Sequence, residues 1–354
     1  MGVREMLCHF TSKRNNYIVS RRTYEEDYSN IISKDIDMTL SGTFLGKYPD
    51  LNINYKSFDN YPVPEEIENL VDTIREKFNI KKKIVLGAGT NGILQNLIRV
   101  YIKGKKDNLI TPYYTFNQAE YATTASGGYT KRVLMDNYEI DLDKIKNSID
   151  SKTKLIYICN PNNPTGKYIE ANEIINLCNS VSIPVIIDES AIEFSHKKSL
   201  IELKRTPKNL IILRSFSKAY GLANLRLGYM VCDKEIEDRY IKNTTTNEFS
   251  GFSAIVCKRM IDNISFVERN VKIIEKERDK LIKELKKINI KLVPTCTNTI
   301  MTETKFDKSF INKLDKNGVS VVPVQNPDGK VCIRIAVQDK ETNRRFIDVL
   351  KKVL

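Results

Sequence analysis

Histidine is scarce in this chain, whose 354 residues contain only His9 and His196. Neither lies at metal-ligand spacing from a second ligand residue, which argues against a catalytic zinc and against a Ser-His-Asp triad. We therefore expect no metal in the functional site, and we expect both histidines to be surface or packing residues. The chain also lacks a Cys-x-x-C pair, and its seven cysteines are scattered. This pattern favours a reducing compartment, the cytoplasm, over a disulfide framework.

Long hydrophobic runs are missing as well. The longest apolar runs, such as residues 185–187 and 210–213, are far too short to span a bilayer and are typical of buried strands. The N-terminus is basic and has neither an apolar core region nor a small-residue cleavage site, so we expect no secretory signal. Hydrophobic residues at 41% and charged residues at 29% are typical of a soluble globular protein without a membrane partner.

Positive charge is in excess, with a net charge of +13. Such an excess can indicate nucleic-acid binding, but the lysines are spread along helical patterns such as residues 271–288 and are not gathered with aromatic residues. A solvated basic surface is the simpler interpretation, and we expect no nucleic-acid partner. A basic field would still favour an anionic cofactor or a phosphorylated substrate.

The order of secondary structure predicts an α/β protein of two domains, which suits a chain of this length. Between about residues 84 and 231, short β-branched runs alternate with helical patterns, which predicts a mainly parallel sheet sandwiched by helices. The C-terminal third, with a long charged helix, short strands and a last helix from Lys340, indicates a smaller α+β domain. We predict a large domain at residues 45–242 and a small domain formed by residues 1–44 and 243–354. The expected strands of the large domain are residues 84–86, 108–111, 154–159, 185–188, 210–213 and 226–231, and the expected helices are residues 91–101, 116–125 and 169–179.

Unusual polar and glycine residues directly follow five of these strands. Ligands of open α/β sheets bind outside the carboxyl ends of the strands, so these residues predict one common site. They are residues 87–91, 113–114, 160–166, 188–189 and 215–218.

Two of these segments are turns. Residues 87–91 contain two glycines before a helix, which allow a ligand to approach the backbone and offer N–H groups to an anion. A plain tight turn explains that motif equally well. Residues 160–166 contain two prolines and a glycine, which fix a rigid turn that can present one Asn side chain to the site. A structural turn explains the prolines but not the number of amides.

Asp188 ends an apolar strand, where a buried and unpaired carboxylate would be costly. A protonated ring nitrogen, a structural salt bridge and a helix N-cap are all compatible with it. The segment that contains Ser215, Ser217 and Lys218, followed by Arg226, favours a ligand site. Its hydroxyls, lysine and arginine can supply a phosphate cradle, an amine nucleophile and a charged anchor.

Taken together, Ser215-x-Ser217-Lys218, Arg226-x-Gly228 and Asn163-Pro164-Thr165-Gly166 resemble the motifs of fold-type I pyridoxal-5'-phosphate (PLP) enzymes of the class I and II aminotransferase superfamily. The pattern is most similar to histidinol-phosphate aminotransferases and threonine-phosphate decarboxylases, and it extends from about residue 40 to the C-terminus. The resemblance implies a fold-type I architecture, PLP bound as a Schiff base on Lys218, and a homodimer with shared active sites.

The resemblance also implies a role for each matching residue. Asp188 would pair with the pyridine nitrogen, and Asn163 would bond the ring hydroxyl and line the substrate site. Tyr114 would stack on the ring, unless it is a core tyrosine. Arg334 would clamp the substrate α-carboxylate, unless it forms a surface ion pair. Tyr61 would reach the phosphate of the neighbouring subunit's cofactor. The phosphate cup would consist of Ala88, Gly89, Thr90, Ser215, Ser217 and Arg226.

Three segments depart from the family pattern. Ala191 stands where aminotransferases of the family usually have a tyrosine that contacts the ring oxygen. Residues 41–46 replace an Asn-x-Asn-Pro-x-Gly motif, and residues 243–247 replace a Pro-Tyr segment. The last two lie where the family recognises the distal part of its substrate.

The predicted function is transfer of an amino group between a small amino acid or amino-alcohol phosphate and a 2-oxo acid. In that reaction Asp188 would keep the ring protonated and Lys218 would move a proton from Cα. A PLP-dependent decarboxylase of an O-phospho amino acid is the alternative, because an upright carboxylate would leave in place of the proton. A PLP-binding regulator that binds nucleic acid is a third hypothesis.

Overall fold

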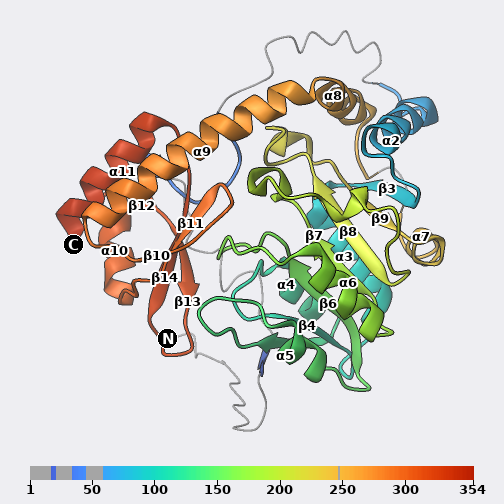
Figure 1. Ribbon diagram of the computed structural model, residues 1–354, viewed down its shortest axis with the longest axis horizontal. Helices are drawn as coiled ribbons and strands as arrows, with labels where there is room; N and C mark the ends of the chain where they lie inside the picture. Colours follow the sequence, from blue (N-terminus) through green and yellow to red (C-terminus); the bar gives the residue numbers. More distant parts are fainter. Residues whose placement is uncertain (1–16, 21–33, 45–58, 246–247) are drawn as a thin grey trace.

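An eight-stranded sheet lies at the centre of the larger part of the molecule (Figure 1). The computed structural model describes residues 17–20, 34–44, 59–245 and 248–354. The strand order is β1-β5-β4-β6-β7-β8-β9-β3. The strands are β1 (Tyr17–Ser20), β3 (Lys83–Gly87), β4 (Asn108–Pro112), β5 (Tyr129–Val133), β6 (Thr153–Cys159), β7 (Val185–Asp188), β8 (Leu210–Ser215) and β9 (Gly228–Cys232).

Strand direction decides which segments meet at the functional edge of this sheet. Strands β5, β4, β6, β7 and β8 are parallel, whereas β9 is antiparallel to both β8 and β3. The carboxyl ends of β3, β4, β6, β7 and β8 therefore lie at one edge. Because β9 runs the other way, the residues that precede it, including Arg226, reach the same edge.

Helices cover both faces of the sheet. One face packs against α3 (Gly89–Tyr101), α4 (Gln118–Ala125) and α7 (Lys234–Ile241), and the buried contacts include Ile93 and Leu97 of α3 with Ile186 of β7. Along β7, Val185 and Ile187 point to the opposite face, as alternation along a strand requires. The helices that pack there are α2 (Pro64–Phe78), α5 (Leu142–Asn147), α6 (Ala171–Ser180), α8 (Gly251–Asp262) and α9 (Ile264–Lys287). The connecting segments include three 3₁₀ turns, η1 (Ile192–Ser195), η2 (Leu200–Glu202) and η3 (Ala223–Leu225).

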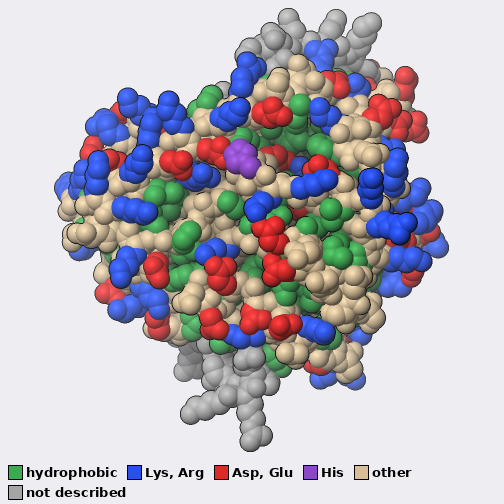
Figure 2. Space-filling view, viewed as in Figure 1, with side chains coloured by type: hydrophobic (Ala, Val, Ile, Leu, Met, Phe, Trp, Pro, Cys, Tyr) green, Lys and Arg blue, Asp and Glu red, His purple; other side chains and the backbone are tan. Residues whose placement is uncertain are grey.

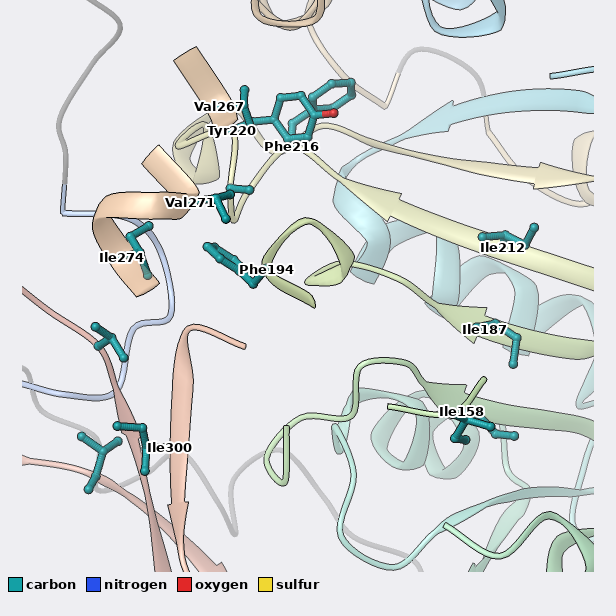
Figure 3. Packing of buried hydrophobic residues seen from close by; sticks show 14 of the residues in the cluster. Ile158, Ile187, Phe194, Ile212, Phe216, Tyr220, Val267, Val271, Ile274 and Ile300 are labelled. Carbon is teal, nitrogen blue, oxygen red and sulfur yellow. The ribbon is translucent and has the colours of Figure 1, made fainter. Parts of the chain in front are cut away.

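The smaller part of the molecule is built on a four-stranded antiparallel sheet of order β10-β11-β14-β13, together with a parallel pair of β12 and β2. Figure 1 shows α9 extending from the large sheet to the small one. Figure 3 shows Val271 and Ile274 of α9 beside Phe194. These residues share one buried cluster with Ile300 of the small sheet, so one continuous core joins the two parts. The elements are β2 (Ile36–Asp37), β10 (Leu292–Val293), β11 (Thr299–Thr302), β12 (Val319–Ser320), β13 (Val322–Gln325), β14 (Val331–Ala336), α10 (Lys308–Lys316) and α11 (Lys340–Val353).

The predicted α/β class with a mainly parallel sheet is confirmed, and each of the six expected strands is present. The expectation that strand residues begin at Arg226 is wrong, because that residue has a left-handed backbone (φ 50°) and β9 begins at Gly228. The division into domains stays a prediction. Of the segment assigned to the small domain, β1 pairs with β5 of the large sheet, whereas β2 pairs with β12.

The described helices include none that is both long and apolar enough to cross a membrane. Lys and Arg side chains are spread over the face shown in Figure 2, interspersed with Asp and Glu. That distribution agrees with a solvated basic surface, and the expected lack of a nucleic-acid partner stays a prediction.

Candidate active site

Asp188 is placed by the alternation and register of the central strands. It is the last residue of β7 and points to the α3 side of the sheet, where it is 3% exposed. Its Oδ1 accepts hydrogen bonds from the Ser190 backbone N–H (3.0 Å) and hydroxyl (2.5 Å), and its Oδ2 accepts one from the Tyr157 hydroxyl (3.0 Å). Burial raises the pKa of Asp188, while these donors and the nearby charge of Lys218 oppose the rise.

Lys218 lies in the loop after β8, at the same edge of the sheet, and is half-buried. Its Nζ donates a hydrogen bond of 2.5 Å to Oγ of Ser41. Burial lowers the pKa of Lys218 to about 8, and the positive charges of Arg334 and Arg226 act in the same direction. An amine with such a pKa is partly neutral at physiological pH, as a nucleophile or base must be.

The residues predicted for the phosphate cup lie around the N-terminus of α3. Gly89 has φ 70°, and a Cβ built there would lie 3.0 Å from the Arg226 guanidinium. A Cβ on Gly228 would lie 2.9 Å from the backbone nitrogen of Thr90. Ala88, the N-cap residue, makes no side-chain capping bond. Gly89 and Gly228 thus allow the Arg226 guanidinium and β9 to lie close against the first turn of α3.

The electrostatics of this cup also fit an anion. A guanidinium beside a helix N-terminus is repelled by the positive end of the helix dipole, and an anion between the two removes that repulsion. The nearby hydroxyls of Ser215 and Ser217 belong to residues only 5% and 9% exposed, and the Ser217 backbone N–H bonds the Ser215 Oγ at 3.0 Å. The residues at this edge therefore fit the phosphate of PLP.

The Asn side chains of the turn after β6 have two different roles: two of them bond neighbouring loop residues, and one points toward the site. The Asn160 side chain bonds both the N–H and the carbonyl of Ile169. The fully buried Asn162 bonds the Tyr114 carbonyl at 2.7 Å and the Thr115 hydroxyl at 2.8 Å. Asn163 differs, since it is half-buried and its Oδ1 accepts a bond from the Arg334 guanidinium at 3.4 Å. Of the three amides, Asn163 is therefore the one directed toward the site.

Arg334 brings the small sheet into contact with this edge. It lies on β14, is 9% exposed, and also donates to the Thr39 carbonyl. Its burial and its position beside Asn163 argue against a place on the surface, and its role as a substrate anchor stays a prediction. A guanidinium held here can bind a carboxylate or a phosphate through two parallel hydrogen bonds.

The structure does not bring two predicted residues to this group. The Tyr114 ring contacts the Tyr113 and Tyr138 rings, at centroid distances of 4.9 and 5.3 Å, and its hydroxyl bonds Asn326 at 2.6 Å. Tyr61 precedes α2 and is 84% exposed. The stacking role of Tyr114 and the intersubunit role of Tyr61 stay predictions.

Sequence reasoning missed three residues that touch the catalytic groups: Ser41, Tyr157 and Ser190. Tyr157 lies inside an apolar strand, where a tyrosine is taken for a core residue. Ser190 follows Asp188 by two positions, a spacing at which a hydroxyl commonly bonds a carboxylate, and this was the available signal. Ser41 begins the departing segment 41–46, but it is distant in sequence from Lys218, and no local pattern indicates their contact. Of the departing segments, residues 45–46 and 246–247 lie outside the described part of the chain.

Comparison with known proteins agrees with this geometry. The sequence pattern of the family described as aminotransferase class I and II matches residues 52–350. The chain belongs to the aminotransferase class I and II family. This assignment confirms the predicted family, the enzyme class and the PLP cofactor. Within the described residues, no cluster of three or more His, Cys, Asp or Glu could hold a metal.

Relatives within this aminotransferase family span most of the chain. Histidinol-phosphate aminotransferase 1 of Archaeoglobus fulgidus is 34% identical over 85% of this chain and 92% of its own length. The histidinol-phosphate aminotransferase of Methanococcus aeolicus is 31% identical over 82% of each chain. Among solved structures, the histidinol-phosphate aminotransferase of Sinorhizobium meliloti in complex with PLP superimposes with a TM-score of 0.82 at 19% identity, over 91% of each chain. The likeness confirms the expected fold.

Proposed function

We propose that this chain is a PLP-dependent aminotransferase that moves an amino group between a small amino-alcohol phosphate of the histidinol-phosphate type and a 2-oxo acid. The observation that carries the proposal is the buried Arg334 guanidinium beside Asn163, whose charge also lowers the pKa of Lys218. An anionic group of the substrate held by Arg334 would lie near the amine of Lys218. The names of the similar proteins support the same substrate class.

The residues present divide the work of such a reaction. PLP, when bound, withdraws electrons from the bond that breaks at the substrate Cα. Asp188 would accept a hydrogen bond from the protonated ring nitrogen, and Arg226, Ser215 and Ser217 would hold the phosphate. The amine of Lys218, neutral above its lowered pKa, can take up and return a proton at Cα. Arg334 can anchor the carboxylate of an amino acid and, in the other half-reaction, the phosphate of an amino-alcohol phosphate.

An assay with histidinol phosphate and 2-oxoglutarate tests this function. We expect a new amino acid to form in step with loss of the phosphorylated amine, without release of carbon dioxide. Carbon dioxide from an O-phospho amino acid, with no amino transfer, would instead establish the decarboxylase, and absence of both activities would contradict the proposal. Salt-sensitive DNA binding without turnover would indicate a regulator.

Replacement of the anchor sharpens the assay. We expect Arg334→Lys to raise KM for both anionic substrates about 10- to 100-fold, because a point charge replaces a bidentate fork. Arg344→Lys is the matched control, since Arg344 is exposed on α11 and pairs only with surface acids in the described structure. Equal effects of the two substitutions would remove Arg334 from the substrate site.

The proposal includes a homodimer with shared sites and a cytoplasmic location. Tyr61 is compatible with the dimer, because its side chain is 84% exposed and so can contact a second chain. Cross-linking or sedimentation at micromolar concentration tests it, and a fully active monomer would contradict it.

A further inference from the structure

We propose that Tyr157 is a positioning residue that holds Asp188 ionised and directed toward the cofactor's ring nitrogen. The inference rests on the proposed function, because the ring nitrogen is the group that Asp188 would hold. Tyr157 does not touch the reacting atoms itself. It acts through the carboxylate.

Strand geometry brings the two side chains together. In the register of β6 and β7, Cys159 lies opposite Asp188 and Tyr157 lies opposite Ile186. Tyr157 and Asp188 are therefore diagonal neighbours on one face of the sheet, within reach of a long side chain. The phenol is fully buried among apolar side chains of the α3 side, and its hydroxyl bonds Asp188 Oδ2 at 3.0 Å. A buried phenol usually bonds such a partner, and this contact restricts the orientation of both groups.

The distribution of donors over the carboxylate makes Tyr157 different from Ser190. An ionised carboxylate offers about four lone-pair sites. The two donors of Ser190 both use Oδ1, whereas Tyr157 uses one site of Oδ2. Oδ1 thus has no lone-pair site left. The one site that no described residue uses is on Oδ2, the oxygen that Tyr157 already binds. A ring N–H and the Tyr157 hydroxyl would share Oδ2, so Tyr157 bears directly on the oxygen that receives the ring proton.

The charges around Asp188 explain why this donor matters. Burial favours the protonated carboxyl, and a protonated Asp188 could not stabilise a cationic ring. The groups that face Asp188 are Ser190 on its own segment, Tyr157 and Cys159 on β6, and Lys218 after β8. Burial raises the pKa of both the Cys159 thiol and the Tyr157 phenol, so these two groups stay neutral and Tyr157 stays a donor. Loss of its hydroxyl would shift the shared proton from the ring toward the carboxylate.

The test is Tyr157→Phe in the holoenzyme, reconstituted with PLP carrying ¹⁵N at the ring nitrogen. We expect the ¹⁵N resonance to move toward that of an unprotonated ring, and kcat to fall about 10- to 100-fold with KM nearly unchanged, as for loss of a hydrogen bond to a charged group. A merely structural role would leave the ¹⁵N resonance in place. The resonance is read without substrate, so it is independent of whether the proposed reaction is the right one.

Tyr229→Phe is the matched control. Tyr229 is a buried tyrosine of β9 in the same sheet, and within the described structure its hydroxyl has no hydrogen-bond partner. We expect this variant to keep the wild-type ¹⁵N resonance and kcat. The same change in both variants would overturn the proposal, as would a Tyr157→Phe enzyme with wild-type resonance and kcat.

A second variant covers the case in which Tyr157→Phe does not fold. Incorporation of 3-fluorotyrosine at position 157 keeps the hydroxyl and makes it a stronger donor. We expect the ¹⁵N resonance then to move in the opposite direction, toward a fully protonated ring. A resonance that does not move in this folded variant would overturn the proposal, unless the wild-type ring is already fully protonated, which a pH titration of the wild-type resonance establishes beforehand. In that case the variant is expected to shift the pH at which the ring loses its proton, because the hydroxyl and the ring N–H share Oδ2, and an unchanged midpoint overturns the proposal.

Discussion

Asp188 and Glu189 are adjacent in sequence and almost equally buried, yet their surroundings are opposite. Glu189 bonds the Ser199 hydroxyl and the Leu200 N–H, and it lies 3.8 Å from the guanidinium of Arg214. Asp188 has hydroxyl and backbone donors, but no cationic side chain of the described residues lies within ion-pair distance of it. Glu189 thus lies close to a cationic side chain, whereas Asp188 has no cationic partner within ion-pair distance among the described residues.

The cationic side chains near Glu189 and near Asp188 differ in the same way, since only those near Glu189 form ion pairs in the described structure. Arg214, on the Glu189 side, is 4% exposed and bonds Glu193 at 2.6 Å. Lys218 and Arg226, on the Asp188 side, have no acidic side chain within ion-pair distance in the described structure. The Asp188 side thus has an acceptor for a cationic ring and donors for an anionic phosphate, which are the charges of protonated PLP.

Lys218→Ala should show the largest effect, because it removes the amine that we propose to bind PLP and to move the proton at Cα. We expect turnover to fall by at least about 10²- to 10⁴-fold and the covalent link to PLP to be lost, while the fold is kept. Borohydride reduction followed by peptide mass analysis measures the link. Labelling of a different lysine in the wild-type protein would contradict this assignment.

Substitution of each of the two adjacent carboxylates by its amide tests directly whether they differ in function. Asp188→Asn should retain PLP but lose about 100-fold or more in kcat, because an amide cannot hold the ring proton. Its apoprotein should lose little stability, because burial disfavours the charge that is removed and the Tyr157 hydroxyl, which donates to Oδ2, can accept from the new amide instead.

Glu189→Gln should behave in the opposite way. We expect a loss of about 1–3 kcal/mol in the free energy of unfolding, because the new amide N–H₂ faces the donors of Ser199 and Arg214, and a kcat within a few-fold of wild type. Urea unfolding and steady-state kinetics on both variants measure the contrast. Similar profiles for the two would refute the division into framework and site.

Tyr61→Phe should have a smaller effect, confined to cofactor retention. If the hydroxyl reaches the partner subunit's phosphate site, its loss weakens PLP binding by about 1.5–3 kcal/mol. Equilibrium dialysis measures the affinity. Mixing an inactive Tyr61→Glu protein with inactive Lys218→Ala should restore activity in heterodimers, and no recovery despite proven subunit exchange would exclude shared sites.

The pH dependence of cofactor capture should show the smallest but most specific effect. Attack on PLP requires a neutral amine, and the Lys218 pKa is lowered to about 8, first by burial and then by Arg334. The rate of capture by the apoprotein should therefore rise with pH and level off above about 8, well below the ordinary lysine value of 10.5. Arg334→Leu should move this midpoint to higher pH. A midpoint near 10 in the wild-type protein would contradict the assignment.

The sequence was informative where local chemistry marks a position. Hydrophobic runs closed by Asp188 or by Ser215 and Lys218 identified both the strands and the edge where their ends meet. Strand β5 was missed because it contains Lys131 and Arg132, which an isolated reading assigns to the surface. In the fold, Lys131 bonds the Ser148 carbonyl and Asp150, and the Arg132 guanidinium lies over the Tyr113 ring.

The residues missed in the site share another cause, which is that their partners are distant in the chain. Ser41 and Lys218 meet only after the segment that follows β2 has bonded the small sheet through Asn298, whose amide donates to the Ser41 carbonyl at 2.8 Å. A pattern read along one sequence contains no information on such pairs, because tertiary packing alone brings them together.

The pairing of β3 with β9 has a consequence for the order of folding. Lys83 lies opposite Cys232, so the chain must complete β4 to β8 or loop them out before these two strands meet. Closing so long a loop is entropically slow compared with forming local contacts. The Gly89 turn and Arg226 flank this pairing and become neighbours only once it has formed. Tight retention of a phosphate-bearing cofactor would then mark chains that have completed this late step, and the cofactor would act as a reporter of finished folding.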